Sequence, residues 1–297
     1  MTAPSPRILV GTSGYSFDDW RGTFYPEHVR ASEMLSFYAS QFPMVEVNFT
    51  YYRMPSARVT QGMERKTPKE FEFVVKLNRV MTHSNPIIGS YVPDSGQAVG
   101  GPVDLFGHAS SQAIGSAAWS LERAIAEFKK GIEPFVDAGK LKCVLAQFPW
   151  GFKNTRDNLR YVIDLAKEFD EFWFVVEFRN ATWASDSVFD ALRQNNIGFC
   201  CVDEPQLEGL FPPVITSTSS DVSYVRFHGR NAAKWWRHDR SSERYDYLYS
   251  IEELRPWADK IQMLAENSKQ TYVLFNNCTD GKAAQNAKQM LSLLGLA

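Results

Sequence analysis

The sequence predicts a single (β/α)₈ barrel that takes up the whole chain, residues 1–297. The length lies within the range of roughly 200 to 400 residues for one complete barrel. Short β-branched or aromatic runs alternate with longer stretches of helical periodicity, which is typical of βα units and a parallel sheet. Eight such units can be counted, and most strand segments are nearly continuous hydrophobics, as strands buried on both faces should be.

The expected strands and helices follow in order along the chain. The strands are expected at residues 8–12, 45–49, 72–76, 142–147, 172–178, 198–203, 223–228 and 271–276. After Ser116, apolar residues recur at steps of three and four, which predicts a helix with one buried stripe. Gly131 and Pro134 leave the end of this helix open. The same periodicity predicts helices around residues 251–264 and 287–294, on either side of the last strand.

Two insertions interrupt the alternation, after strands three and seven, on the side where barrel active sites are built. Residues 84–116 hold six Gly, three Pro and six Ser, a composition that favours a loop. A loop of this length is either an ordered lid or a disordered excursion. Residues 229–249 interleave basic and aromatic side chains and predict a cationic, aromatic wall.

Composition restricts the environment and the partners of the chain. Thirty-two basic residues against thirty-four acidic ones give a formal net charge of −2, so no global field indicates a polyanionic partner. The N-terminus lacks an apolar signal core, and eighteen consecutive apolar residues occur nowhere, so we expect a cytoplasmic protein without membrane contact. The four cysteines show no CxxC spacing and are interpreted as reduced core residues rather than as a zinc site.

Polar residues are concentrated where the expected strands end. Three strands end in two polar residues around one hydrophobe, at residues 46–48, 177–179 and 226–228. Lys76, Gln147, Asp203 and Asn276 close four others. Residues two apart on a strand share a direction, so these side chains are expected to point into the barrel mouth. Any one Arg and Glu there can also be a buried structural ion pair, but burying the whole set without a ligand would carry a large desolvation cost.

Short motifs recur along nearly the whole chain. A Gly-Thr-Ser-Gly-aromatic run stands at residues 11–15, Glu-Phe-Arg at 177–179 and Arg-Phe-His-Gly at 226–229. The other motif positions are residues 20–22, 24–26 and 45–52, Lys76, Thr82, His83, Gln147, Pro149, Trp183, residues 275–277 and Gly281. Together they resemble the barrel proteins called domain of unknown function 72, or YecE-like. This resemblance implies an eight-fold βα barrel, similar in plan to endonuclease IV and the xylose isomerase-like barrels, with no established activity.

The first functional hypothesis is a hydrolase or lyase that acts on a phosphorylated or sugar-like substrate with acid and base groups from the strand ends. Glu177 is expected to be the general base and His228 the proton donor, with Asp203 orienting His228. Because the cations outnumber what the carboxylates need, the most favoured partner is a small anionic ligand.

The expected site residues form two groups. The candidate catalytic residues are Glu46, Lys76, His83, Glu177, Asp203 and His228. The candidate substrate-binding residues are Tyr15, Asn48, Gln147, Arg179, Trp183, Arg226, Arg230, Tyr245, Asn276 and Asn277. Arg179, Arg226 and Lys76 are expected to hold a phosphate or carboxylate, the arginines through a bidentate fork.

Three alternatives remain open at the level of sequence. Glu46, Glu177, Asp203 and His228 could ligate a divalent metal, although no cofactor is predicted and such sites ordinarily recruit more histidines. The insertion at 229–249 could track nucleic-acid phosphates while its aromatic rings stack on bases. The barrel could also serve only as an interaction scaffold.

Overall fold

The computed structural model describes residues 7–83 and 120–297 and contains eight parallel strands arranged as a nearly closed barrel, which confirms the predicted fold class. The strands are β1 (Arg7–Thr12), β2 (Met44–Val47), β3 (Glu72–Lys76), β4 (Leu141–Gln147), β5 (Trp173–Glu177), β6 (Gly198–Asp203), β7 (Val222–Phe227) and β8 (Gln270–Phe275). They pair in the order β1-β8-β7-β6-β5-β4-β3-β2. A single bridge between Ser13 and Glu46 joins the ends of β1 and β2, so the barrel is almost complete.

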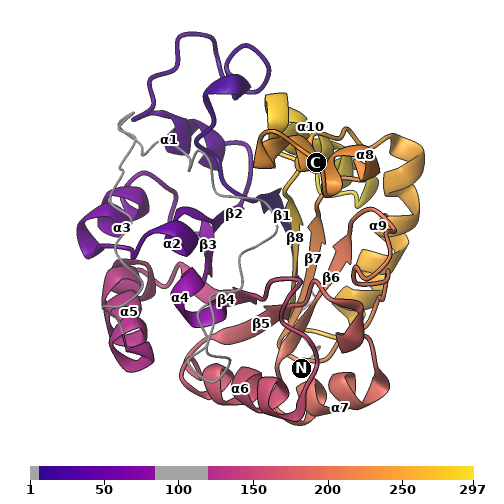
Figure 1. The fold of residues 1–297 in the computed structure, drawn as a ribbon. Coiled ribbons are helices and arrows are strands. Elements are labelled where there is room, and N and C mark those ends of the chain that lie inside the picture. Colours follow the sequence, from indigo (N-terminus) through magenta and orange to yellow (C-terminus); the bar gives the residue numbers. More distant parts are fainter. Residues whose placement is uncertain (1–6, 84–119) are drawn as a thin grey trace, which may run out of the picture.

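Helices surround the strands, as Figure 1 shows. The α-helices are α1 (Met34–Ala39), α2 (Phe49–Tyr52), α3 (Ala57–Glu64), α4 (Arg79–Thr82), α5 (Leu121–Asp137), α6 (Arg156–Lys167), α7 (Asp186–Gln194), α8 (Ala232–Trp235), α9 (Ile251–Glu266) and α10 (Lys282–Leu293). The 3₁₀ turns are η1 (Asp18–Trp20), η2 (Ala181–Trp183), η3 (Ser241–Tyr245) and η4 (Thr279–Gly281). None of these helices, which lie within residues 7–83 and 120–297, is long and apolar enough to cross a lipid bilayer.

The regular alternation of strand and helix is broken between β6 and β7. Residues 204–221 contain no helix, where the sequence pattern predicts a full βα unit. Three prolines in this stretch lack the N–H that a helix interior needs, and the run of Ser and Thr at 216–220 has low helix propensity. The extended chain covers β6 instead, because the Phe211 ring packs against Phe199 and Thr218 Oγ1 donates to the Ile197 carbonyl.

Gly131 and Pro134 both lie inside α5, which continues to Asp137. At Gly131 the helix passes so close to the neighbouring chain that a Cβ atom there would lie 2.3 Å from the Pro55 carbonyl oxygen. Thr60 Oγ1 on α3 donates to the Gly131 carbonyl at 2.7 Å, so α3 and α5 are joined at this glycine.

The interior of the barrel is polar along much of its length. On β7, Tyr224 and Arg226 point inward and reach Glu46 on β2, a strand that β7 does not pair with. Near the strand starts, Tyr272 donates to the Glu72 carboxylate at 2.6 Å across the barrel. Barrels of this class are ordinarily filled by layers of branched apolar side chains. Here hydrogen bonds and ion pairs also cross the centre between strands that do not pair with each other.

Candidate functional site

The centre of the site is an arginine between two carboxylates. Arg226 Nη2 lies 2.6 Å from Glu46 Oε1, and Arg226 Nη1 lies 2.6 Å from Glu177 Oε2. The three residues come from β7, β2 and β5, and all are buried. Tyr224 donates to the second Glu46 oxygen at 2.7 Å. Because the Arg226 guanidinium is occupied by two carboxylates in the interior, it acts as the internal counter-ion rather than as an open anion clamp.

Glu177 is a carboxylate whose ionised form is favoured by its surroundings. Burial by itself raises its pKa, but the positive charges of Arg226 and Arg179 outweigh burial and bring the pKa well below its ordinary value. Arg179 Nε lies 2.7 Å from Glu177 Oε1. A carboxylate held in this way accepts protons poorly at neutral pH, so the geometry does not favour the predicted role of Glu177 as general base.

His228 is held neutral above Glu177. Its Nε2 lies 3.1 Å from Glu177 Oε1, and Asn276 Nδ2 lies 3.1 Å from its Nδ1. With Asn276 donating to Nδ1, Nε2 carries the proton and donates to Glu177. Burial first, and then the charge of Arg179, lower the pKa of His228 to about 3. His228 is therefore placed where the sequence predicts, but it has no imidazolium proton to supply at neutral pH.

Lys76 lies in the mouth and titrates near neutral pH. Its Nζ donates to Gln147 Oε1 at 2.7 Å and lies 4.3 Å from the centre of the Tyr51 ring. Burial, followed by the charge of Arg226, lowers the pKa of Lys76 to about 7. Tyr51 in turn places its hydroxyl 2.9 Å from His83 Nε2. His83 thus contacts the site through Tyr51.

Glu204 belongs to the site although sequence reasoning did not select it. Arg179 Nη1 donates to Glu204 Oε2 at 3.2 Å, and Arg179 Nη2 lies 3.5 Å from Gln147 Oε1. Glu204 Oε1 is buried without a hydrogen-bond partner in the described part of the chain. Burial raises the pKa of Glu204 to about 8, so its carboxyl group is largely protonated at neutral pH. The alternation of side chains along β6 could have identified Glu204. Cys200 directs its thiol at Glu177, and Glu204, four residues later, shares its direction.

The Asp203 side chain points away from the barrel interior, so the prediction that Asp203 orients His228 is wrong. Its two oxygens accept from Arg230 at 2.8 and 2.6 Å, while Tyr249 donates to it at 2.7 Å and Trp257 at 2.9 Å. These partners lie between β6 and α9, outside the barrel interior. Asp203 and Arg230 therefore form a separate structural cluster and do not orient His228.

The four residues proposed as metal ligands do not direct their side chains at one common point. Glu46 and Glu177 face the Arg226 guanidinium, and Asp203 lies in the cluster behind the strand. Within residues 7–83 and 120–297, no group of three or more His, Cys, Asp or Glu side chains is arranged to hold a metal ion. The four cysteines are free, and three of them are buried.

Several further candidates pack outside the cluster around Arg226. Trp183 is stacked on Phe178, with ring centroids 4.1 Å apart, on the outer side of β5. Asn277 donates to the Tyr247 carbonyl and to Asn286. The remaining two are Tyr15, whose ring packs against Tyr38, and Asn48, whose buried Oδ1 lacks a hydrogen-bond partner among the described residues.

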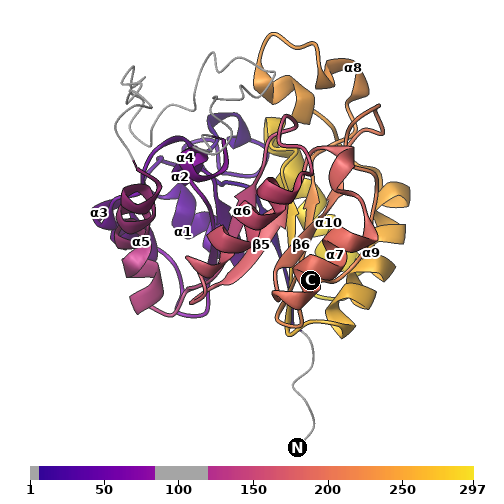
Figure 2. The same ribbon diagram turned by 60° about the horizontal axis from the view of Figure 1, so that its bottom comes forward.

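The segment 229–249 lies over the mouth, where Figure 2 shows α8 at the upper end of the barrel. Trp235, Trp236 and Arg244 from this segment, with Trp150, Leu210, Gln147 and Arg179, surround a cavity of about 10 Å³. A volume of this size holds about one water molecule. Tyr245 lies beside His228, with ring centroids 6.1 Å apart.

Two cations of the predicted cationic wall are paired with carboxylates. Arg230 pairs with Asp203 and Glu253, and Lys234 pairs with Glu243 at 2.9 Å. Arg244 is buried, and its guanidinium packs on the Trp235 ring at 5.5 Å. The other predicted insertion, residues 84–116, lies outside the described residues.

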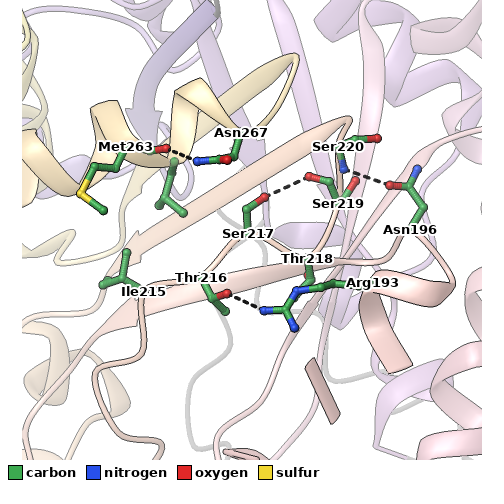
Figure 3. A pocket seen from close by; sticks show the side chains of 11 residues that line it. Arg193, Asn196, Ile215, Thr216, Ser217, Thr218, Ser219, Ser220, Met263 and Asn267 are labelled. Carbon is green, nitrogen blue, oxygen red and sulfur yellow. Dashed lines mark hydrogen bonds between the residues drawn. The ribbon is translucent and has the colours of Figure 1, made fainter. Parts of the chain in front are cut away.

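A larger hollow of about 500 Å³ lies between α7 and α9 (Figure 3). It occupies the place where the helix between β6 and β7 is missing. Arg193 donates to Thr216 Oγ1, and Ser217 Oγ donates to the Ser219 carbonyl, so hydroxyl groups and amides dominate its walls. The titratable residues of the mouth do not line it, and we place the candidate site in the mouth.

Comparisons with known proteins agree with the fold. The family model described as "Protein of unknown function DUF72" matches residues 9–297. The "UPF0759 protein YunF" of Bacillus subtilis is 30% identical over 299 residues, covering 97% of this chain and 95% of that protein. A DUF72 family protein from Thermotoga maritima has a crystal structure that is 39% identical and superimposes with a TM-score of 0.78, covering 97% of this chain and 99% of that one. A second, from Enterococcus faecalis, is 26% identical with a TM-score of 0.78, covering 98% and 96%.

Proposed function

The chain belongs to the DUF72 family of barrel proteins, and we propose from the chemistry of its mouth that it is a hydrolase or lyase acting on a small phosphorylated or sugar-like substrate. The observation that carries this proposal is the presence of two oppositely perturbed groups in one buried network. The pKa of Lys76 is lowered to about 7 and that of Glu204 is raised to about 8. Such pairs identify acid and base roles in enzymes.

The two groups are connected through polar side chains. Lys76 donates to Gln147, and Arg179 contacts both Gln147 and Glu204. Near neutral pH a large share of Lys76 is an uncharged amine that can accept a proton, and Glu204 is an acid that can give one. These two residues replace Glu177 and His228 in the acid and base roles. Glu177 and His228 hold the cations and the hydrogen-bond network in place.

An anionic substrate is supported by two arginines that line the cavity. Arg226 is used internally, but Arg179 and Arg244 both line the cavity, and both guanidinium groups contact the Trp235 ring. A phosphate or carboxylate between them would meet two charge-assisted donors. Because the cavity is small, Trp235 and Trp236 must move to admit a substrate.

Thermal unfolding in the presence of small sugar phosphates tests this proposal. At about a hundred times its dissociation constant, a ligand should add roughly 2.7 kcal/mol and raise the midpoint by a few degrees. We expect this shift in the wild type and in Arg237→Gln, whose arginine is exposed, and a smaller shift in Arg244→Gln. Equal shifts in all three proteins would place the ligand elsewhere, and no shift with any sugar phosphate would count against the proposal.

Binding of nucleic acid or nucleotides is the second candidate function. It is favoured by Trp150 and Trp236, which remain 38% and 39% exposed at the rim with ring centroids 5.9 Å apart. Such rings can stack on bases. Single-stranded oligonucleotides should then stabilise the protein, and the effect should fall steeply as salt is raised, because phosphate contacts release counterions.

A further inference from the structure

We propose that Lys76 forms a covalent imine with the carbonyl group of a small anionic substrate, an inference that rests on the acid–base function proposed above and narrows it toward a lyase. The position of Lys76 is the first argument. It ends β3, its side chain lies in the barrel mouth, and it keeps 8% of its surface exposed. Its Nζ is directed by a neutral acceptor, Gln147, at 2.7 Å rather than by a carboxylate.

The surroundings of Lys76 favour the nucleophilic form of the amine. A lysine becomes nucleophilic when it is desolvated and placed beside another cation. Both conditions hold, because Lys76 is buried against the Tyr51 ring and lies in the field of Arg226 and Arg179. These influences outweigh the opposing charges of Glu177 and Glu46 and bring the pKa to about 7, so a large fraction is unprotonated at neutral pH.

The same network contains a proton donor for the step in which water is lost. Glu204 is largely protonated, and it is linked to Gln147 through Arg179. The Lys76 lone pair would attack the carbonyl carbon, and a proton would pass from nitrogen to oxygen to give a carbinolamine. The hydroxyl would then leave as water with a proton from Glu204, and the nitrogen lone pair would complete the C=N bond. The protonated imine has one positive charge, and Glu204 is left as a carboxylate.

The charge of the product explains why the substrate should be anionic. A protonated imine is disfavoured by the same burial and cations that lower the pKa of Lys76. A carboxylate or phosphate on the substrate would offset both the new charge and that of Arg179. The substrate class is therefore a 2-oxo acid or the phosphate ester of a small aldose or ketose.

Reductive trapping tests this proposal. The wild-type protein is incubated separately with glyoxylate, pyruvate and dihydroxyacetone phosphate, and sodium borohydride then converts any imine to a secondary amine. We expect intact mass spectra to show an adduct with at least one probe. Peptide mapping should locate this adduct on Lys76. The rate at which the adduct forms should rise with increasing pH. The midpoint of this rise should lie near the Lys76 pKa of about 7 rather than near the pKa of a surface lysine.

Two variants complete the test. Lys76→Arg keeps the positive charge but cannot form an imine, so the adduct should be lost, whereas Lys153→Met removes an exposed lysine near the rim and should retain it. Peptide mapping of the wild type decides the question even if a variant fails to fold. An adduct distributed over surface lysines would contradict the proposal that Lys76 forms the imine. If a probe stabilises the protein thermally yet leaves no adduct on Lys76, the imine is rejected while the acid–base function stands.

Discussion

Lys76, Glu204 and His228 differ from ordinary surface groups in one respect, which is that burial opposes the charged form of each. Burial and nearby cations lower the pKa of Lys76 and of His228, whereas burial raises that of Glu204. As a result, Glu204 and His228 are largely neutral in the folded protein near neutral pH, and a large share of Lys76 is uncharged. The fixed charges around them are Glu46, Glu177 and the arginines.

The raised pKa of Glu204 makes stability depend on pH in a defined direction. Between the ordinary value of 4.5 and about 8, the folded protein holds a proton that the unfolded chain has released. The stability associated with Glu204 is therefore present at low pH and is lost as pH rises through this window. Glu204→Gln removes this dependence, so we expect the variant to gain on the wild type by on the order of a few kcal/mol as pH rises.

Urea unfolding of both proteins near each end of that window measures this gain. Glu208→Gln, an exposed position in the same connection, is the control and should follow the wild type at both pH values. A constant difference between wild type and Glu204→Gln at the two ends would mean that Glu204 titrates normally.

Strand parity predicted the position of several residues that the structure brings together, although Asn48, which shares the parity of Glu46, lies outside the cluster. Glu46, Glu177, Arg179, Arg226 and His228 were each expected in the mouth because of their alternation, and their contacts gather there. Asp203 was selected as the last polar residue of its strand, although its parity places it on the outer face. Glu204 was missed for the same reason. The pKa directions could not be read from sequence, because they depend on burial and on cations from other strands.

At the level of elements, the joint between α3 and α5 shows how one glycine sets a packing distance. Gly131→Ala would place a methyl group 2.3 Å from the Pro55 carbonyl oxygen, so a helix must shift. We expect a loss of about 1 to 3 kcal/mol in the free energy of unfolding, typical of overpacking. Gly62→Ala, on α3 with nothing within 4 Å of the new methyl, should instead gain about 0.5 to 1 kcal/mol from helix propensity. Chemical denaturation of both variants measures the contrast, and equal effects would contradict this packing argument.

The strands were more predictable than their connections for a physical reason. Buried strands carry continuous apolar runs, and their bounds agree with the observed ones within a few residues. The connection between β6 and β7 has no continuous apolar run. Its place in the fold is fixed by contacts such as that between Cys201 Sγ and the Thr216 carbonyl. Likewise, β2 ends at Val47, and Phe49, expected in the strand, begins α2.

For the whole molecule, the central question is what replaces an apolar core inside the barrel. Arg226 joins β7 to both β2 and β5, so three strands that do not pair with one another are connected through one guanidinium. Replacing a complete buried ion-pair group by apolar residues is often neutral, whereas removing one partner leaves an uncompensated charge. The polar centre therefore makes the fold of the barrel depend on the same residues that shape the candidate site.

Arg226→Met tests this dependence, since it leaves Glu46 and Glu177 buried without their shared counter-ion. We expect a loss of about 3 to 5 kcal/mol in the free energy of unfolding, measured with urea at neutral pH. Arg230→Met is the matched control, because Arg230 is partly exposed and Asp203 keeps its hydrogen bonds from Tyr249 and Trp257. Combining Arg226→Met with Glu46→Gln and Glu177→Gln should recover part of the loss. If Arg226→Met costs no more than Arg230→Met, the ion pairs at the barrel centre contribute little to the stability of the barrel.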